Sequence, residues 1–385
     1  MKKKIVLALT LILTVSFTFF IYSYQTSKNL ETRDKLDRAS AIANFEDSTI
    51  SLFFVGDLMG HQPMISSAKI VDSNKYEYTH WFQYITPIIE EYDFAIGNLE
   101  VALGGEPYTG YPQFSSPDSY AEGAKKSGFD FLITANNHSL DRGKKGLERT
   151  IDVLDQLKIE HTGTFKNEKE RNDNYPYIKI LKSKKIAILN YTYGTNGLKV
   201  ELPNIVNAID TIQIREDIKK AKALKSDFIL VTIHWGSEYQ RNYNDFQSNL
   251  AQWLCDEGAD AIIGMHPHVV QPMEIMHPKN NKSKNIPIAY SLGNFVSNQR
   301  DQYKNGGIAV GLELKIKNNK LSFDNWSYLP FWVRLGGKPK GYYIIPVSEW
   351  EKNPGKFELN SSEEQQIKQF ADDTRTLLLG SKEMK

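Results

Sequence analysis

Short apolar runs alternate with amphipathic stretches along most of this chain, and this alternation restricts the fold more than any other feature of the sequence. The runs lack a strict apolar–polar alternation, so we expect strands that are buried on both faces of a sheet. The stretches between them have helical periodicity, as in 143–157, 209–224 and 245–257. Strands that alternate with helices predict the α/β class, with helices covering both faces of the sheet. The predicted strands are 51–55, 94–96, 129–134, 185–190, 228–233, 259–263 and 286–291.

The C-terminal part of the chain has a different pattern. Residues 307–316, 321–329 and 342–346 have strand character with no helical stretch between them, which predicts antiparallel β structure. The tail 361–379 has one apolar face and is predicted to be a helix. Ser361 and Glu364 have the spacing of a capping box at the start of that helix.

The N-terminus predicts a membrane anchor. Lys2, Lys3 and Lys4 precede an uncharged apolar run over 5–24. At a helical rise of ~1.5 Å per residue, such a run spans the roughly 30 Å hydrocarbon core of a bilayer. The lysines are expected to stay on the cytoplasmic side, which places everything after the run outside. We therefore predict an uncleaved single-pass anchor in the cell membrane, with an extracytoplasmic C-terminal domain.

These patterns divide the chain into four predicted segments. They are the cytoplasmic basic flank with the transmembrane anchor (1–24), a polar stalk (25–48), a folded α/β domain (49–348) and a C-terminal helical tail (349–385).

Charge and cysteine content narrow the possible partners. The formal net charge is +1, so the chain has no overall field that would attract nucleic acid, and no nucleic-acid partner is predicted. Cys255 is the single cysteine and cannot form an internal disulfide. We expect it to be a buried, apolar thiol.

Clusters of metal-capable residues follow the predicted strands. Because the carboxyl ends of strands in such sheets form one rim, these clusters are expected to converge on a single site, although they lie far apart in the sequence. The clusters are GDLMGH (56–61), GNLE (97–100), NNHSLD (136–141), HWGSE (234–238) and GMHPH (264–268).

The residue types in these clusters suit divalent metal ions. Carboxylate, amide oxygen and imidazole are ligands for Mn, Zn, Fe or Mg, and Cys255 is the one thiolate candidate. Two ions about 3.5–4 Å apart with a bridging carboxylate form the arrangement used for phosphoryl transfer. Two imidazoles in the HPH segment would point to opposite sides of an extended chain, unless the loop bends so that they serve different ions.

Single residues in the clusters also have structural interpretations. Asp57 and Asp141 could each cap a helix. A histidine after a strand, such as His234, is often a satisfied structural group. A metal or former metal site explains the recurrence of the clusters better than five separate structural roles do.

At these clusters, and at SLGNF (291–295), the sequence resembles the CapA family of bacterial poly-γ-glutamate capsule proteins. The domain of that family is similar to the calcineurin-like metallophosphoesterases. The resemblance runs from about Leu52 to Pro346. It implies a layered α/β/β/α sandwich that is anchored to the membrane, in agreement with the N-terminal pattern.

The resemblance also implies roles for individual residues. Glu100 would supply a bridging carboxylate, and His138 would be a general acid, with Asp141 placed to orient its imidazole. The implied metal ligands are Asp57 for the first ion, Asn137 and His234 for the second, and His266 and His268 with one ion each.

Two positions depart from the phosphoesterase pattern. Met59 stands where a histidine ligand is usual, and His61 could replace it if the loop curls back. Asn98 stands at the slot of the bridging aspartate, with Glu100 displaced by two residues. The residues expected as additional ligands, or as groups that orient the ligands, are His61, Asn98, Glu238 and Asn294.

The function that these patterns favour is a CapA-like role in the synthesis or export of poly-γ-glutamate or a similar surface polymer, with a dinuclear metal hydrolase site. The expected partners are the cytoplasmic membrane, an anionic polymer or phosphoester substrate, and other capsule synthase subunits. The rival interpretation is a non-catalytic subunit that binds polymer or assembles with the synthase. Met59 and Asn98 favour the rival, whereas Asn137, His138 and the HPH segment favour the enzyme.

Overall fold

The computed structural model describes residues 48–336 and 341–384. Residues 49–315, 321–336 and 341–384 form one compact unit, which carries every predicted site residue. The predicted membrane span and the stalk up to residue 47 lie outside the described residues. Within the part of the chain that is described, no helix is both long and apolar enough to cross a membrane.

The first sheet contains eight strands in the order β16-β15-β14-β1-β2-β3-β4, with β13 also paired to β1. β2, β3 and β4 extend from β1 as parallel neighbours, and β13 is also parallel to β1. β15 and β16 pair antiparallel, as predicted for the C-terminal part. The strands are β1 (Ser48–Leu58), β2 (Phe94–Leu99), β3 (Phe131–Ile133), β4 (Glu160–Thr162), β13 (Asn294–Val296), β14 (Gly306–Lys317), β15 (Lys320–Gly336) and β16 (Gly341–Pro346).

The second sheet has the order β11-β12-β10-β9-β7-β6. Its four inner strands are parallel, and β6 and β11 close the two edges as antiparallel strands. A separate pair is formed by β5 (Thr164–Phe165) and β8 (Ile205–Val206). The strands of the second sheet are β6 (Tyr177–Leu181), β7 (Lys184–Thr192), β9 (Phe228–His234), β10 (Ala261–Met265), β11 (Met273–Met276) and β12 (Ile286–Ala289).

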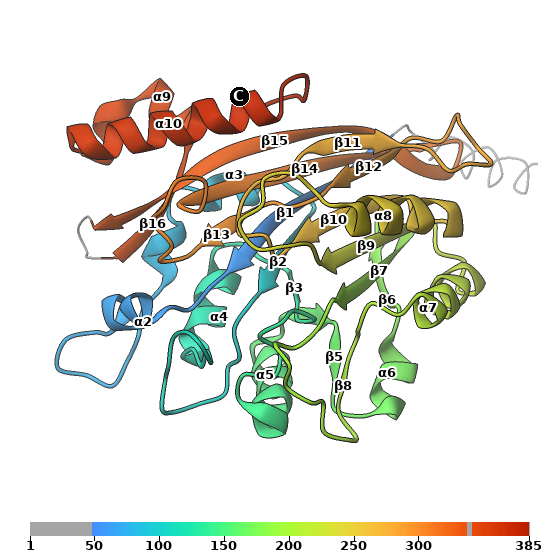
Figure 1. The fold of residues 1–385 in the computed structure, drawn as a ribbon, viewed down its shortest axis with the longest axis horizontal. Helices are drawn as coiled ribbons and strands as arrows, with labels where there is room; N and C mark the ends of the chain where they lie inside the picture. The colour runs from blue at the N-terminus through green and yellow to red at the C-terminus, as the bar shows by residue number, and fades with distance from the viewer. Residues whose placement is uncertain (1–47, 337–340, 385) are drawn as a thin grey trace, which may run out of the picture. The chain divides into compact units, whose positions relative to one another are not determined.

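Helices cover the sheets, which meet through side chains. The ring of Phe131 on β3 lies 4.8 Å from that of Tyr177 on β6, and Lys179 lies over the ring of Phe94. One apolar core joins α2 and α4 to the first sheet, and a second joins α7 and α8 to the second sheet. Figure 1 shows how the helices and strands are arranged. The predicted α/β class is therefore confirmed. The helices are α2 (Gln62–Ala68), α3 (Thr86–Ile89), α4 (Asp118–Lys126), α5 (Gly143–Leu157), α6 (Glu168–Asn174), α7 (Thr211–Ala223), α8 (Asp245–Glu257), α9 (Val347–Lys352) and α10 (Ser361–Leu377), with 3-10 turns η1 (Thr79–Phe82) and η2 (Pro354–Phe357).

The C-terminal helix begins with a different cap from the predicted one. Asn360 is the N-cap of α10: its side chain accepts hydrogen bonds from the backbone N–H groups of Ser362 and Glu363. The Glu363 side chain accepts in turn from the N–H of Asn360. The capping box assigned to Ser361 and Glu364 was therefore wrong by one residue, because an asparagine amide oxygen caps a helix as well as a serine hydroxyl does.

Cys255 has the predicted environment. It lies on α8 inside the core of the second sheet and is 1% exposed. Burial raises the pKa of its thiol to about 12, so the thiol is protonated at neutral pH and is a poor metal ligand.

Candidate metal centre

Parallel pairing aligns the carboxyl ends of β1 and β2 on the first sheet and those of β9 and β10 on the second. On the first sheet, Asp57 of β1 lies opposite both Asn98 of β2 and Asn294 of β13. On the second sheet, His234 ends β9 and lies opposite Met265, the last residue of β10. Asp57 and Asn98 are inside their strands rather than beyond them, so the strands are longer than the sequence predicted.

Two groups of potential ligand atoms form where these ends meet. In each group the ligand atoms all lie within 4.8 Å of one another. Glu100 belongs to both groups, and all of these side chains are buried. The groups are Asp57, Glu100 and His268, and Glu100, His234 and His266.

A bend in the HPH loop separates the two histidines. His266 and His268 have φ angles of 101° and 57°, outside the extended region. Their rings face different groups: His268 Nδ1 lies 3.0 Å from Asp57 Oδ2, and the ring of His266 lies 4.7 Å from that of His234. The sequence predicted that the two histidines serve different ions only if this loop bends, and the structure has such a bend.

The donor set fits divalent metal ions. Glu100 Oε1 and His266 Nδ1 are buried without a hydrogen-bond partner. An unsatisfied buried polar atom costs about 1–3 kcal/mol, so a group that accepts their lone pairs would remove that cost. Oxygen and imidazole nitrogen without sulfur suit Mn, Zn, Fe or Mg.

The charges in the centre are arranged for cation binding. Burial and the nearby charge of Asp57 raise the pKa of Glu100 well above its usual value. Burial alone would also raise the pKa of Asp57, but hydrogen bonds from His268 and Asn98 hold it below its usual value. Burial lowers the pKa of His234 well below its usual value and that of His266 to about 3. Both imidazoles are therefore neutral at pH 7, which is the state that binds metal.

Asn98 donates a hydrogen bond to Asp57, one of the potential ligands. Its neighbour Asn136 has a fixed amide, because Nδ2 donates to the Leu99 carbonyl (2.8 Å) and Oδ1 accepts from the His138 N–H (3.1 Å). Asn136 Nδ2 therefore faces Asn98 Oδ1 at 3.3 Å. This leaves the amide nitrogen of Asn98 facing Asp57 Oδ1 at 2.8 Å, where it donates a hydrogen bond.

Asn137 presents its oxygen to the second group. Its Oδ1 lies 2.8 Å from Nε2 of His234, and its Nδ2 donates to Asn196 Oδ1 at 3.2 Å. Asn196 and Tyr193 come from the loop after β7, which carries no metal-capable cluster, and the sequence interpretation missed both. The ring of Tyr193 lies 4.6 Å from that of His266 and is nearly parallel to that of His234.

His138 and Asp141 form a buried pair. His138 Nδ1 lies 2.7 Å from Asp141 Oδ2, and the same carboxylate oxygen accepts from the N–H of Phe114. The Phe114 ring packs edge-on against the imidazole. Donation from Nδ1–H to the carboxylate leaves Nε2 as the nitrogen that can exchange a proton. Asp141 precedes α5, whose N-cap is Arg142, so the capping interpretation of Asp141 was wrong.

The remaining predicted residues lie around the two groups. His61 belongs to neither: it is the N-cap of α2, its Nδ1 accepts from the N–H of Asn298, and burial lowers its pKa to about 4. Asn294 Nδ2 donates to the backbone carbonyl of His268. Glu238 is exposed and belongs to neither group. Asp57 lies within β1, so it does not cap a helix.

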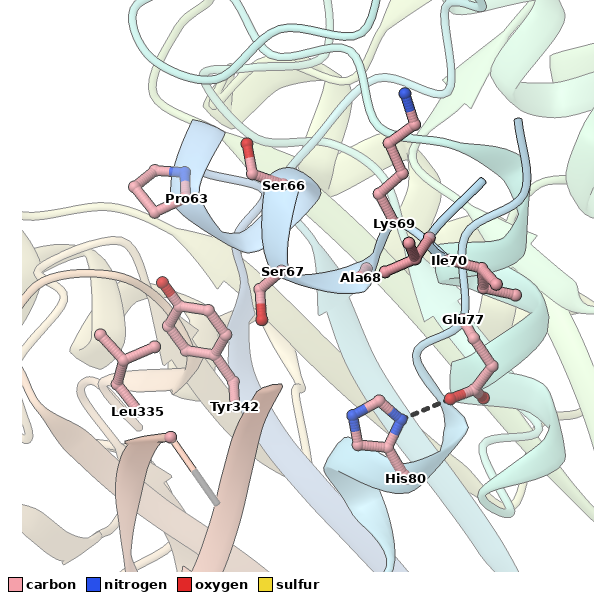
Figure 2. Close-up of a pocket in the computed structure, with 12 residues that line it drawn as sticks. Pro63, Ser66, Ser67, Ala68, Lys69, Ile70, Glu77, His80, Leu335 and Tyr342 are labelled. Carbon is pink, nitrogen blue, oxygen red and sulfur yellow. Dashed lines mark hydrogen bonds and ion pairs between the residues drawn. The ribbon is translucent and has the colours of Figure 1, made fainter. Parts of the chain in front are cut away.

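A cavity of about 920 Å³ lies elsewhere, between α2 and the β15–β16 hairpin (Figure 2). Its walls include Pro63, Leu335 and Tyr342, and His80 is held there by a contact with Glu77. It is lined by none of the predicted metal ligands.

A buried set of carboxylate, amide and imidazole donors at the meeting ends of two sheets defines an α/β protein with a candidate metal centre. The chain belongs to the bacterial capsule synthesis protein family PGA_cap, whose model matches residues 51–299. It is 29% identical over 279 residues to the capsule biosynthesis protein CapA of Bacillus anthracis, covering 69% of this chain and 64% of that protein. It is 30% identical over 272 residues to the PGA biosynthesis protein CapA of Bacillus subtilis (strain 168), covering 67% and 66%. The match thus spans just under two thirds of the length of these relatives.

Solved structures show a weaker similarity. A phosphatase from Mycoplasma pneumoniae has a TM-score of 0.42 and 13% identity, covering 80% of this chain and 98% of that one. The calcineurin-like phosphoesterase YfkN from Bacillus subtilis has a TM-score of 0.42 and 14% identity, covering 86% and 98%. Similarity at this level carries no conclusion about activity.

Proposed function

We propose that this chain is a membrane-anchored hydrolase of capsule synthesis or export, with a centre that holds two divalent metal ions. Its substrate is a phosphoester or an anionic polymer such as poly-γ-glutamate. The observation that carries the proposal is the position of Glu100. Its carboxylate is shared by two buried donor groups, as a bridging ligand would be.

Each donor group would hold one ion. The first would be held by Asp57, Glu100 and His268. The second would be held by Glu100, His234 and His266, with the amide oxygen of Asn137 beside His234. Ions bound there supply Lewis acidity toward a phosphoryl or carbonyl oxygen.

The other residues move protons and shape the centre. Asp141 holds the His138 imidazole by Nδ1, so Nε2 can give a proton to a departing oxygen. Asn98 holds Asp57 in place through its hydrogen bond, and Asn136 donates to Asn98 and fixes its orientation. The ring of Tyr193 packs beside the histidines of the second group.

Metal analysis of the full chain tests the proposal. The wild type is expected to bind two equivalents of Mn or Zn by elemental analysis. His266→Ala and His268→Ala should each lower that content while the domain stays folded, because each removes a ligand from one group only. His277→Ala is the matched control, since His277 Nδ1 donates to the Lys284 carbonyl and His277 belongs to neither donor group. Full metal content in either site variant would show that the replaced histidine is not a metal ligand.

The non-catalytic polymer-binding or assembly subunit remains the second candidate. The observation that favours it is the orientation of Asn98, which places an amide N–H where phosphoesterases have a bridging aspartate. If the metal-loaded wild type hydrolyses neither an aryl phosphoester nor poly-γ-glutamate, the protein is the non-catalytic subunit.

The anchor is a separate part of the proposal. The run over 5–24 should remain attached to the mature protein, with the α/β domain outside the cytoplasmic membrane and in reach of other capsule synthase subunits. N-terminal sequencing of the membrane-extracted protein checks this. A mature start near residues 41–44 would mean that the segment is cleaved.

A further inference from the structure

The arginines in the described residues fall into two sets. In the first set, each guanidinium forms an ion pair with a carboxylate; its members are Arg149, Arg171, Arg215, Arg334 and Arg375. Arg142, Arg241 and Arg300 have no such pair with any described carboxylate. All three lie in segments that follow a cluster of the metal centre. Arg142 follows Asp141, Arg241 lies in the loop after β9, and Arg300 lies in the loop after β13.

Arg300 has the clearest connection to the centre. It lies four residues beyond the end of β13, which runs parallel to β1 with Asn294 opposite Asp57. The N–H of Asn298 in the same loop donates to His61 Nδ1 at 3.3 Å. The His61 ring packs against Phe114, which packs against His138. The loop that carries Arg300 is thus connected to His138, the residue proposed as proton donor, through His61 and Phe114.

The guanidinium of Arg300 is held in place without being neutralised. Nη1 donates to the Val333 carbonyl at 2.8 Å, and Nη2 donates to the Ser297 carbonyl at 2.6 Å. Nε is buried and has no partner. A guanidinium has five N–H groups, so part of its donor capacity is unused. Two neutral carbonyls and the face of the Tyr342 ring, whose centroid lies 5.9 Å from Cζ, orient the charge, but no described carboxylate balances it, and a largely buried charge without a counter-ion is costly.

No neighbouring acid in the loop supplies the missing charge. Asp301 is the next residue, but it pairs with Lys304. The charge of Arg300 acts on His61, since it is among the causes that lower the pKa of His61, after burial and the charges of His268 and His138. An anion brought by a ligand would complete this arrangement.

We propose that Arg300 recognises an oxyanion of the ligand, a phosphate or a carboxylate, as that ligand reaches the metal centre. The inference deepens the proposed function and rests on it for the identity of the centre. The planar guanidinium fork matches both kinds of oxyanion and, with both Nη atoms already braced by carbonyls, is ordered before the ligand arrives.

Calorimetric binding to the full, metal-loaded chain tests the proposal, with inorganic phosphate and a γ-linked glutamate trimer as probes. Arg300→Gln should raise the Kd for at least one probe about 10- to 100-fold, the loss of a charge-assisted hydrogen-bonded contact. Arg300→Lys keeps the charge without the fork and should show a smaller rise. The matched control Arg215→Gln removes a charge that is paired with Glu257 on α8 and should leave both Kd values unchanged. Loss of phosphate binding alone indicates a phosphoester, and loss of trimer binding alone indicates polymer carboxylates.

Three results would overturn the inference. One is unchanged binding of both probes by Arg300→Gln. Another is a wild type that binds neither probe. The third is equal weakening by the Lys and Gln variants with equally lowered melting temperatures, which would reduce Arg300 to a brace between Ser297 and Val333.

The inference and the proposed function can fail separately. A wild type that hydrolyses substrate while Arg300→Gln binds both probes normally would keep the function and reject the inference. A wild type without hydrolysis, whose probe binding is lost in Arg300→Gln, would keep the inference and reject the hydrolase. Metal content should be the same in wild type and Arg300→Gln in either case.

Discussion

Replacement of His138 by alanine is expected to lower the rate of phosphoester hydrolysis about 10²–10⁴-fold while the protein keeps its metal, because a general acid contributes about that factor and is not a ligand. The geometry behind this expectation is the bond between His138 Nδ1 and Asp141 Oδ2, which fixes the ring and leaves Nε2 for proton transfer. The carboxylate is itself held by the N–H of Phe114. Steady-state rates with an aryl phosphodiester and a phosphomonoester measure the loss.

The leaving group provides the internal control for this variant. A substrate whose leaving group departs without protonation should recover part of the lost rate in His138→Ala, because the missing proton then matters less. Asp141→Asn should show a smaller loss of the same kind, since it weakens the orientation of the ring and keeps the imidazole. Equal rates for wild type and His138→Ala would assign the histidine a structural role.

Local features of the fold were predictable because local sequence determines them. The bounds of α5 and α8 agree with the prediction, since each has a clear apolar periodicity, and α8 ends at Gly258, whose φ of 117° favours glycine. The cap of α10 was misplaced by one residue, because Asn360 and Ser361 are both good caps and the sequence does not rank them.

The convergence of the ligands was also predictable, because it follows from parallel strands. Asp57 and His268 are 211 residues apart and in contact, because Asp57 lies near the carboxyl end of β1 and His268 follows β10. The orientation of Asn98 was not predictable, since it is set by Asn136, whose amide is fixed by two backbone groups. Nor was the position of His61, which is the N-cap of the short helix α2 and belongs to neither donor group.

Replacement of Glu100 by glutamine is expected to stabilise the protein when metal is absent and to destabilise it relative to wild type when metal is present. In the metal-free protein Glu100 is fully buried beside Asp57, with Oε1 unpartnered. Burial raises its pKa, so the folded state binds this proton more tightly than the unfolded state does. Its contribution therefore becomes destabilising as the pH rises above the unfolded pKa. Glutamine has no charge to bury, and the metal-free variant should be more stable than wild type by about 1–3 kcal/mol at neutral pH.

Added metal should make the wild type more stable than Glu100→Gln. A ligand that binds only the folded state stabilises it by about 4 kcal/mol at a free concentration of 1,000 Kd, and the wild type should gain this for each ion. The variant should lose metal from both sites together, because Glu100 belongs to both donor groups, and its activity should fall to background. Urea unfolding with EDTA and with Mn measures both signs, and Glu168→Gln on the exposed face of α6 is the control for the same chemical change. A variant that is less stable than wild type in EDTA, or that keeps one full equivalent of metal, would show that Glu100 does not bridge the two groups.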